Sequence, residues 1–128
     1  MSVHALIMDA SPVRRQSLKQ ALTESRLAEF TFAEAGTCEE VRLRFDPDTT
    51  DLVFVAVDVK MAVSIVFRLV AALRAMQKRP LHIVLVGSES TLQRLDLVGA
   101  DRTLIWPVHP KSARAHLEPL LEPAGSTR

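Results

Sequence analysis

Residues 52–57 read Leu-Val-Phe-Val-Ala-Val, a nearly continuous apolar run that is rich in β-branched side chains. A strand that is apolar on both sides is typical of a parallel sheet with both faces covered. Short apolar runs also occur at residues 3–8, 30–35, 81–86 and 103–106. Such runs predict strands. The sequence therefore predicts a sheet of five strands, with residues 52–57 buried on both faces.

Helix-start signals separate the predicted strands. Ser11 is a favoured N-cap and Pro12 fits a first helical turn, so we expect a helix from there to about residue 26. Residues 37–40, Thr-Cys-Glu-Glu, have the form of a capping box, and the helix that they open should end before Asp46-Pro47. Further helices are predicted at residues 62–77, at residues 91–98 before Gly99, and from Pro110 onward.

Strand–helix repeats with short links predict an α/β fold. The expected architecture is a doubly wound, five-stranded parallel sheet of flavodoxin-like order 2-1-3-4-5, with helices on both faces. Residues 1–122 should form this one domain, and residues 123–128 a flexible tail or a truncated linker. Ligands of such sheets bind at the carboxyl ends of the strands. The residues expected at that edge are Asp9, Ala10, Ala56, Asp58, Gly87, Ser88 and Trp106.

Composition limits the classes of function. The net charge of +1 argues against a nucleic-acid partner, because such proteins usually carry a strong positive excess. The most apolar stretch, residues 61–76, is shorter than the ~20 residues of a membrane span and contains Arg68 and Arg74. Cys38 is the only cysteine, and no secretory signal is apparent at the N-terminus. We therefore expect a cytoplasmic protein without a membrane partner.

Three stretches resemble the receiver domains of bacterial two-component response regulators, the chemotaxis-regulator family. Residues 6–15, Leu-Ile-Met-Asp-Ala-Ser-Pro-Val-Arg-Arg, are similar to the family's first strand and acidic turn, and residues 51–58 to its central strand. Residues 99–107, Gly-Ala-Asp-Arg-Thr-Leu-Ile-Trp-Pro, resemble its Gly-Ala-Asp-x-Tyr-Leu-x-Lys-Pro segment. The resemblance covers nearly the whole chain and implies the receiver fold.

The residues that carry receiver chemistry are mostly replaced. In that family two adjacent carboxylates bind Mg²⁺ together with an Asp that accepts a phosphoryl group, and a Thr or Ser and a Lys contact the phosphate. The resemblance places Asp9 and Ala10 at the acidic pair, so that one carboxylate is missing. It places Gly87 at the hydroxyl position, with Ser88 adjacent, and Trp106 at the Lys position. Mg²⁺ would lose a ligand and the phosphate its Lys.

The position of the phosphoryl acceptor has two interpretations. Counting along the strand from Asp51 places Ala56 there. Counting back from the next helix, where residues 58–61 resemble Asp-x-Asn-Met and Arg74 falls in phase, places Asp58 there instead. We favour Ala56, because burial sets the register of a strand whereas loop lengths vary.

These observations lead to two main hypotheses. The first is a degenerate receiver, or pseudo-receiver: a non-enzymatic, cofactor-free module that engages a signalling protein, an output domain or a second copy of itself. The second is a phosphoacceptor in a phosphorelay that uses Asp58, Asp9 and Ser88, with Mg²⁺ held by the two carboxylates. Nucleotide or second-messenger binding at the same edge is a third hypothesis.

The helix at residues 62–77 offers a candidate interface. Its core side is centred near Leu69 and Leu73, which leaves Val63 and Phe67 on the far flank, bordered by Arg74. We expect Phe67 to be partly exposed, as interface anchors often are. The alternative is a tilted helix that buries Val63 and Phe67.

Four local features carry further predictions. The Trp106-Pro107 bond should be cis, with the indole across the vacated phosphate site. Pro119 should stop or kink the last helix. Asp9 either binds metal, caps the first helix or pairs with a base. Cys38 lies in a first helical turn, where the helix dipole lowers a thiol pKa, but no partner suggests catalysis.

Overall fold

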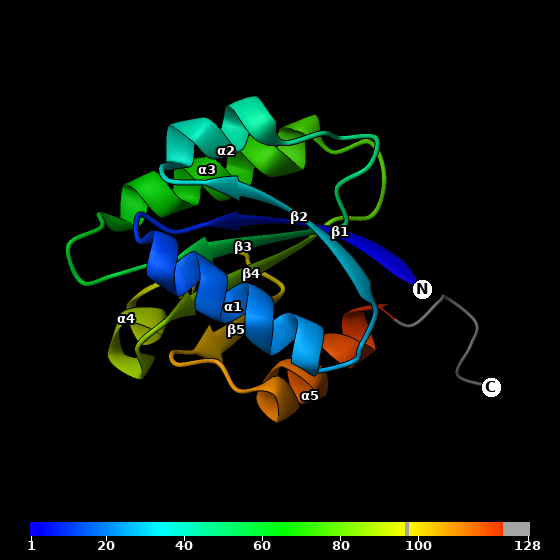
Figure 1. The fold of residues 1–128 in the computed structure, drawn as a ribbon. Coiled ribbons are helices and arrows are strands. Elements are labelled where there is room, and N and C mark those ends of the chain that lie inside the picture. The colour runs from blue at the N-terminus through cyan, green and yellow to red at the C-terminus, as the bar shows by residue number, and fades with distance from the viewer. Residues whose placement is uncertain (97, 122–128) are drawn as a thin grey trace.

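A computed structural model describes residues 1–96 and 98–121, and the predicted tail at residues 123–128 lies outside them. Its five strands pair in parallel in the order β2-β1-β3-β4-β5, which confirms the predicted topology (Figure 1). The strands are β1 (Ser2–Met8), β2 (Glu29–Ala35), β3 (Leu52–Ala56), β4 (His82–Gly87) and β5 (Arg102–Ile105).

Helices cover both faces of the sheet. Figure 1 shows α1 and α5 against one face and α2 and α3 against the other. The helices are α1 (Pro12–Glu24), α2 (Cys38–Arg44), α3 (Val63–Met76), α4 (Glu89–Arg94) and α5 (Pro110–Leu121). The predicted helix at residues 91–98 is too long, because the chain leaves α4 after Arg94 and buries both Leu95 and Val98 in the core.

The predicted caps form. The Ser11 hydroxyl accepts the Arg14 N–H at 3.2 Å at the start of α1. The Thr37 hydroxyl accepts the Glu40 N–H at 3.1 Å at the start of α2. The Glu40 carboxylate accepts the N–H of Gly36 rather than that of Thr37, so the capping box closes one residue early. These side chains satisfy N–H groups that have no partner inside the helix.

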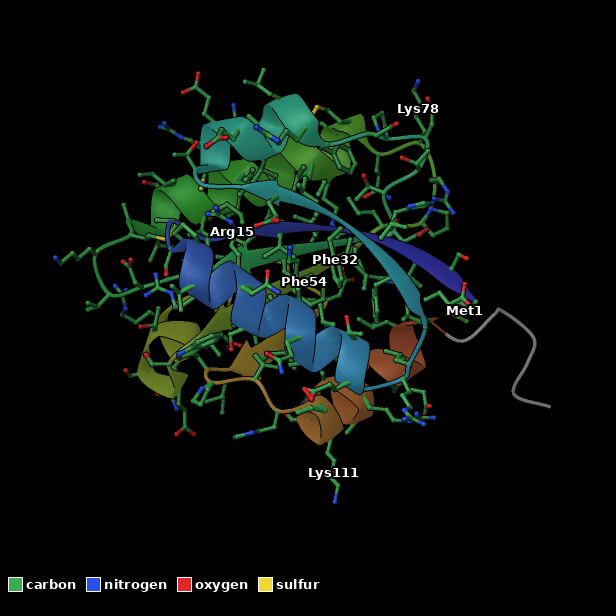
Figure 2. All side chains as sticks on the ribbon, viewed as in Figure 1. Met1, Arg15, Phe32, Phe54, Lys78 and Lys111 are labelled. Atoms are coloured by element: carbon green, nitrogen blue, oxygen red, sulfur yellow. The ribbon has the colours of Figure 1, made fainter. Side chains whose placement is uncertain are left out.

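The β3 strand lies at the centre of two apolar cores. Leu52 and Phe54 belong to the core under α1 and α5, whereas Val53 and Val55 belong to the core under α2, α3 and α4. Phe54 is fully buried, and Figure 2 shows it beneath α1. The alternation follows from the period of a strand, in which successive side chains point to opposite faces. The β3 strand therefore contributes side chains to both cores, one on each face of the sheet.

The α3 helix faces the core as predicted. Leu69 and Leu73 are fully buried, whereas Val63 is 41% and Phe67 54% exposed. The expected exposure of Phe67 is confirmed, and the alternative of a tilted helix that buries both residues is wrong.

The last helix includes Pro119 and continues to Leu121, where the described residues end, so it does not stop at the proline itself. The expected stop or kink near Pro119 stays a prediction. Leu117 is fully buried, and Leu120 and Leu121 pack against the core under α1 and α5. This packing opposes the loss of one helical hydrogen bond at Pro119 and holds the last turn in place.

Candidate functional site

A cavity of about 440 Å³ lies at the carboxyl ends of β1, β3 and β4. This is the edge at which the strand order reverses between β1 and β3, where doubly wound sheets bind ligands. All seven residues predicted for this edge line the cavity: Asp9, Ala10, Ala56, Asp58, Gly87, Ser88 and Trp106. Pro107, which the resemblance to receivers adds to the pocket, does not line it.

The Asp9 carboxylate is held by Arg14. Asp9 is buried, and its side chain is 8% exposed against 47% for Arg14. Arg14 Nε donates to Oδ1 at 3.1 Å and to Oδ2 at 2.9 Å, and Nη2 donates to Oδ1 at 2.8 Å. The Ser11 N–H also donates to Oδ1, at 2.9 Å. Of the three roles predicted for Asp9, pairing with a base is the one that the structure contains.

Sequence reasoning missed the role of Arg14. Its guanidinium reaches back five residues from the first turn of α1 to the end of β1. The hydrogen bonds that Arg14 donates to Asp9, and then the negative charge of Asp9, raise the pKa of the Arg14 guanidinium, and the charge of Asp58 adds to this. The only signal in the sequence was an Arg in the first turn of a helix that starts just after a strand-end Asp.

A second group of charges supports the same corner. Arg15 Nη1 donates to the backbone carbonyl of Asp9 at 2.5 Å, and Arg15 Nε pairs with Glu34 at 2.8 Å. Lys19 also pairs with Glu34, at 2.9 Å. These contacts tie α1 to β2 beside the cavity, and they lower the pKa of Glu34, with Lys19 the larger influence.

The residues at this edge do not fit Mg²⁺. A divalent ion of this kind takes oxygen ligands, usually from one or two carboxylates. Both oxygens of Asp9 already accept from Arg14, and Ala10 has no carboxylate to offer. Across residues 1–96 and 98–121, no three or more His, Cys, Asp or Glu side chains gather closely enough to hold a metal ion. We therefore derive no chemical step through a metal here.

The end of β3 brings both candidate acceptor positions to the cavity. Met8 pairs with Val55, so Ala56 follows at the level of Asp9. Asp58 lies two residues further on and is exposed. Its Oδ1 accepts the Lys60 N–H at 2.8 Å and the Met61 N–H at 3.1 Å, and so caps its own turn.

Gly87 has no room for a side chain. A Cβ built on Gly87 would lie 2.8 Å from the backbone oxygen of Val57 and 3.0 Å from a Val57 methyl carbon. A side chain at position 87 would therefore require the backbone at Val57 or Gly87 to move. The adjacent Ser88 hydroxyl is used as the N-cap of α4, where it accepts the Thr91 N–H at 3.3 Å.

Trp106 borders the cavity from the end of β5. The residue is partly buried and packs against the core under α1 and α5, so the indole does not point wholly into solvent. The backbone N–H of Trp106 donates to the Gly87 carbonyl at 2.9 Å. The Trp106-Pro107 bond is cis, as predicted.

Cys38 differs from the sequence-based expectation. Burial raises the pKa of its thiol above the ordinary value, and the positive charge of Arg42 opposes this only in part. The effect expected from the start of α2 is therefore not the dominant one, because removing a thiolate from water disfavours its charge. The neutral thiol that results is a poor nucleophile.

Comparison with solved structures identifies the fold. A two-component response regulator from Clostridium difficile matches with a TM-score of 0.67 at 22% identity, over 88% of this chain and 90% of that chain. A candidate pilus assembly protein from Burkholderia thailandensis matches with a TM-score of 0.67 at 17% identity, over 86% of this chain and 90% of that chain. A response regulator from Burkholderia pseudomallei, with a phosphorylated aspartic acid and a calcium ion, matches with a TM-score of 0.62 at 19% identity, over 90% of this chain and 66% of that chain.

The chain therefore has the fold of response-regulator receiver domains. No protein-family model and no curated protein sequence matches it. Within the described ranges, no helix combines the length and the apolar character needed to cross a membrane.

Proposed function

We propose that this chain is a pseudo-receiver, a signalling module that engages a partner protein or an output domain without phosphotransfer. The observation that carries the proposal is the Arg14 guanidinium on the Asp9 carboxylate. A phosphoacceptor site needs that carboxylate free to bind a cation. In this chain the Arg14 guanidinium occupies the Asp9 carboxylate in place of a metal cation.

Two further positions support the proposal. Gly87 packs so closely against Val57 that a hydroxyl-bearing side chain would require the backbone to move. Trp106 stands where a Lys would contact the phosphate, and an indole carries no positive charge. Restoring phosphotransfer would therefore need several separate changes.

An apolar surface supports a role in protein interaction. We define the α3 patch as Val63 and Phe67, which lie four residues apart on one side of the helix and are 41% and 54% exposed. Exposed aromatic and aliphatic side chains that lie close together mark many interaction sites. Arg74, the third residue of the candidate interface, instead directs its guanidinium to Leu81 and Asp101, so Val63 and Phe67 are the better contact candidates.

Phosphorylation tests the proposal directly. The protein is incubated with Mg²⁺ and acetyl phosphate, and separately with beryllofluoride, and then followed by intact mass spectrometry and amide NMR. We expect no phosphoryl adduct and no shift of the amides around the cavity. Because Asp58→Asn removes the nucleophile and preserves shape, we also expect it to leave the engagement of the protein partner intact. A phosphoryl adduct that disappears in Asp58→Asn would overturn the proposal.

The same experiment tests the second candidate, a phosphoacceptor at Asp58. That candidate is favoured by one observation, the exposed position of Asp58 at the cavity. It requires Asp58 to give up its hydrogen bonds to Lys60 and Met61, or to react through its other oxygen.

Phe67→Ser tests the α3 patch. Because the side chain is half exposed, we expect the free energy of unfolding to change by less than about 0.5 kcal/mol. Any self-association measured by light scattering should fall in this variant and persist in Leu43→Ser, a control on α2 that is 79% exposed. A loss of several kcal/mol in urea unfolding would instead mean that Phe67 supports the core.

A further inference from the structure

Among the described residues, one charge on the cavity wall has no ion-pair partner. The charged residues of the described ranges that line the cavity are Asp9, Arg14 and Asp58. Asp9 and Arg14 neutralise each other through direct hydrogen bonds. No ion pair within the described part of the chain involves Asp58, whose only hydrogen bonds there come from two backbone N–H groups to Oδ1. The cavity therefore carries a net charge of about one unit, and it is negative.

The rest of the wall is more apolar than polar, and Thr37, Ser88 and Thr91 add hydroxyl groups to it. The volume of the cavity, about 440 Å³, falls in the range of small-molecule sites, which are mostly apolar with a few polar groups. Trp106 supplies an aromatic surface from β5, and Asp58 lies across the sheet after β3. The apolar lining includes Met8, Ala56, Val57, Val59, Met61 and Trp106.

The lining of the cavity favours a ligand with a positive charge over one with a negative charge. Anions such as a nucleotide phosphate need cationic or amide donors, and the cation that lines this cavity within the described residues, Arg14, already donates to Asp9. A cation would find a carboxylate at Asp58 and an indole at Trp106, and indole is the aromatic ring that attracts cations best.

We propose that this cavity binds a small organic cation, an ammonium group on an apolar or aromatic body, with Asp58 as its counterion and Trp106 as its wall. The proposal depends on the lining of the cavity and does not rest on the absence of phosphotransfer.

Trp106 provides its own reporter. It is the only Trp in the chain, and the chain has no Tyr, so its fluorescence reports on the cavity without other contributions from those residues. Three probes share a benzene ring and differ in the charge of the group attached to it: benzylammonium is positive, benzyl alcohol neutral and benzoate negative. Each is titrated at neutral pH, and binding is checked by amide NMR.

We expect benzylammonium to bind about tenfold more tightly than benzyl alcohol, which corresponds to one modest charge contact. Benzoate should bind most weakly. Asp58→Asn should remove the preference for the ammonium probe, whereas Asp48→Asn, a control at a carboxylate that is 70% exposed and does not line the cavity, should keep it.

Tighter binding of benzoate or of inorganic phosphate would overturn the proposal, as would an ammonium preference that survives Asp58→Asn. The proposal would also be overturned if none of the three probes bound at millimolar concentration. These outcomes leave the pseudo-receiver proposal standing, because that proposal fails only when a phosphoryl group is transferred to the chain.

Discussion

The two edges of the sheet each contain an Arg–Asp pair, and the two pairs do different work. At the amino edge, Arg74 Nη2 lies 2.7 Å from Asp101 Oδ2, and the two residues are 27 positions apart in the chain. At the carboxyl edge, Arg14 lies 2.8 Å from Asp9, only five positions away. The chemistry is the same, but the first pair joins distant elements and the second closes a local turn.

The amino-edge pair also satisfies the backbone. Arg74 Nη1 donates to the Leu81 carbonyl at 2.8 Å, and Asp101 Oδ2 accepts the Ile83 N–H at 2.7 Å. The pair therefore joins the end of α3 to the starts of β4 and β5. The Gly-Ala-Asp stretch at residues 99–101, which resembles receivers in sequence, thus has a structural role at the amino edge of the sheet.

The largest effect is expected at the amino edge. Asp101→Ala removes the partner of Arg74 and leaves the fully buried Ile83 N–H without its carboxylate acceptor, at a cost of about 2–3 kcal/mol in the free energy of unfolding. Urea denaturation measures this loss. Asp101→Asn retains an acceptor oxygen and should lose clearly less. Equal losses in the two variants would show that the hydrogen bond to Ile83 is not what matters.

A comparable but smaller loss is expected from Gly87→Ala at the carboxyl edge. The added Cβ meets the backbone oxygen of Val57 at 2.8 Å, and such overpacking costs about 1–3 kcal/mol. Gly36→Ala is the matched control, since its Cβ would meet the ends of two flexible side chains, Glu40 at 3.2 Å and Arg15 at 3.9 Å, and no backbone atom within 3.9 Å. A Gly87→Ala protein as stable as the Gly36→Ala protein would mean that the edge relaxes easily.

Arg14→Ala should cost about 1–2 kcal/mol. Removing one member of a fully buried pair costs more, but Arg14 is half exposed and Asp9 keeps the hydrogen bond from Ser11. A double-mutant cycle with Asp9→Asn isolates the coupling of the pair. Arg44→Ala, which breaks an exposed pair with Glu40, is the control. A coupling energy no larger than that of the exposed Arg44–Glu40 pair would show that burial of Asp9 does not strengthen its ion pair with Arg14.

The smallest expected effect is the contribution of Glu34 to stability at acidic pH. Hydrogen bonds from Lys19 and then Arg15 lower the pKa of Glu34 from its ordinary 4.5, so Glu34 stabilises the fold above that pH and loses this contribution as the pH falls through its lowered pKa. Glu34→Gln should therefore flatten the acid side of the stability curve by less than about 1 kcal/mol, because Glu34 is 39% exposed. Unfolding from neutral to acidic pH measures this, with Glu29→Gln on the same strand as control. Identical curves for the wild type and Glu34→Gln would contradict it.

Much of the site was accessible from the sequence. The seven edge residues that line the cavity follow from the strand order, because parallel strands that end at one edge bring their carboxyl ends together. Asp9 as an ion-pair residue was one of the predicted outcomes, but Arg14 as its partner was not. The choice between Ala56 and Asp58 remains a prediction.

The sequence by itself determined the order of strands and helices, the caps at Ser11 and Thr37 and the buried side of α3. Each of these features depends on contacts within about four residues or on a repeating pattern, so it can be predicted from neighbouring residues in the sequence. Only the tertiary structure decided that Arg14 turns back to Asp9, that Arg74 joins three elements and that Gly87 has no room for a side chain. A long charged side chain settles on whichever partner the folded chain presents, and the space beside a glycine is defined by a strand distant in sequence.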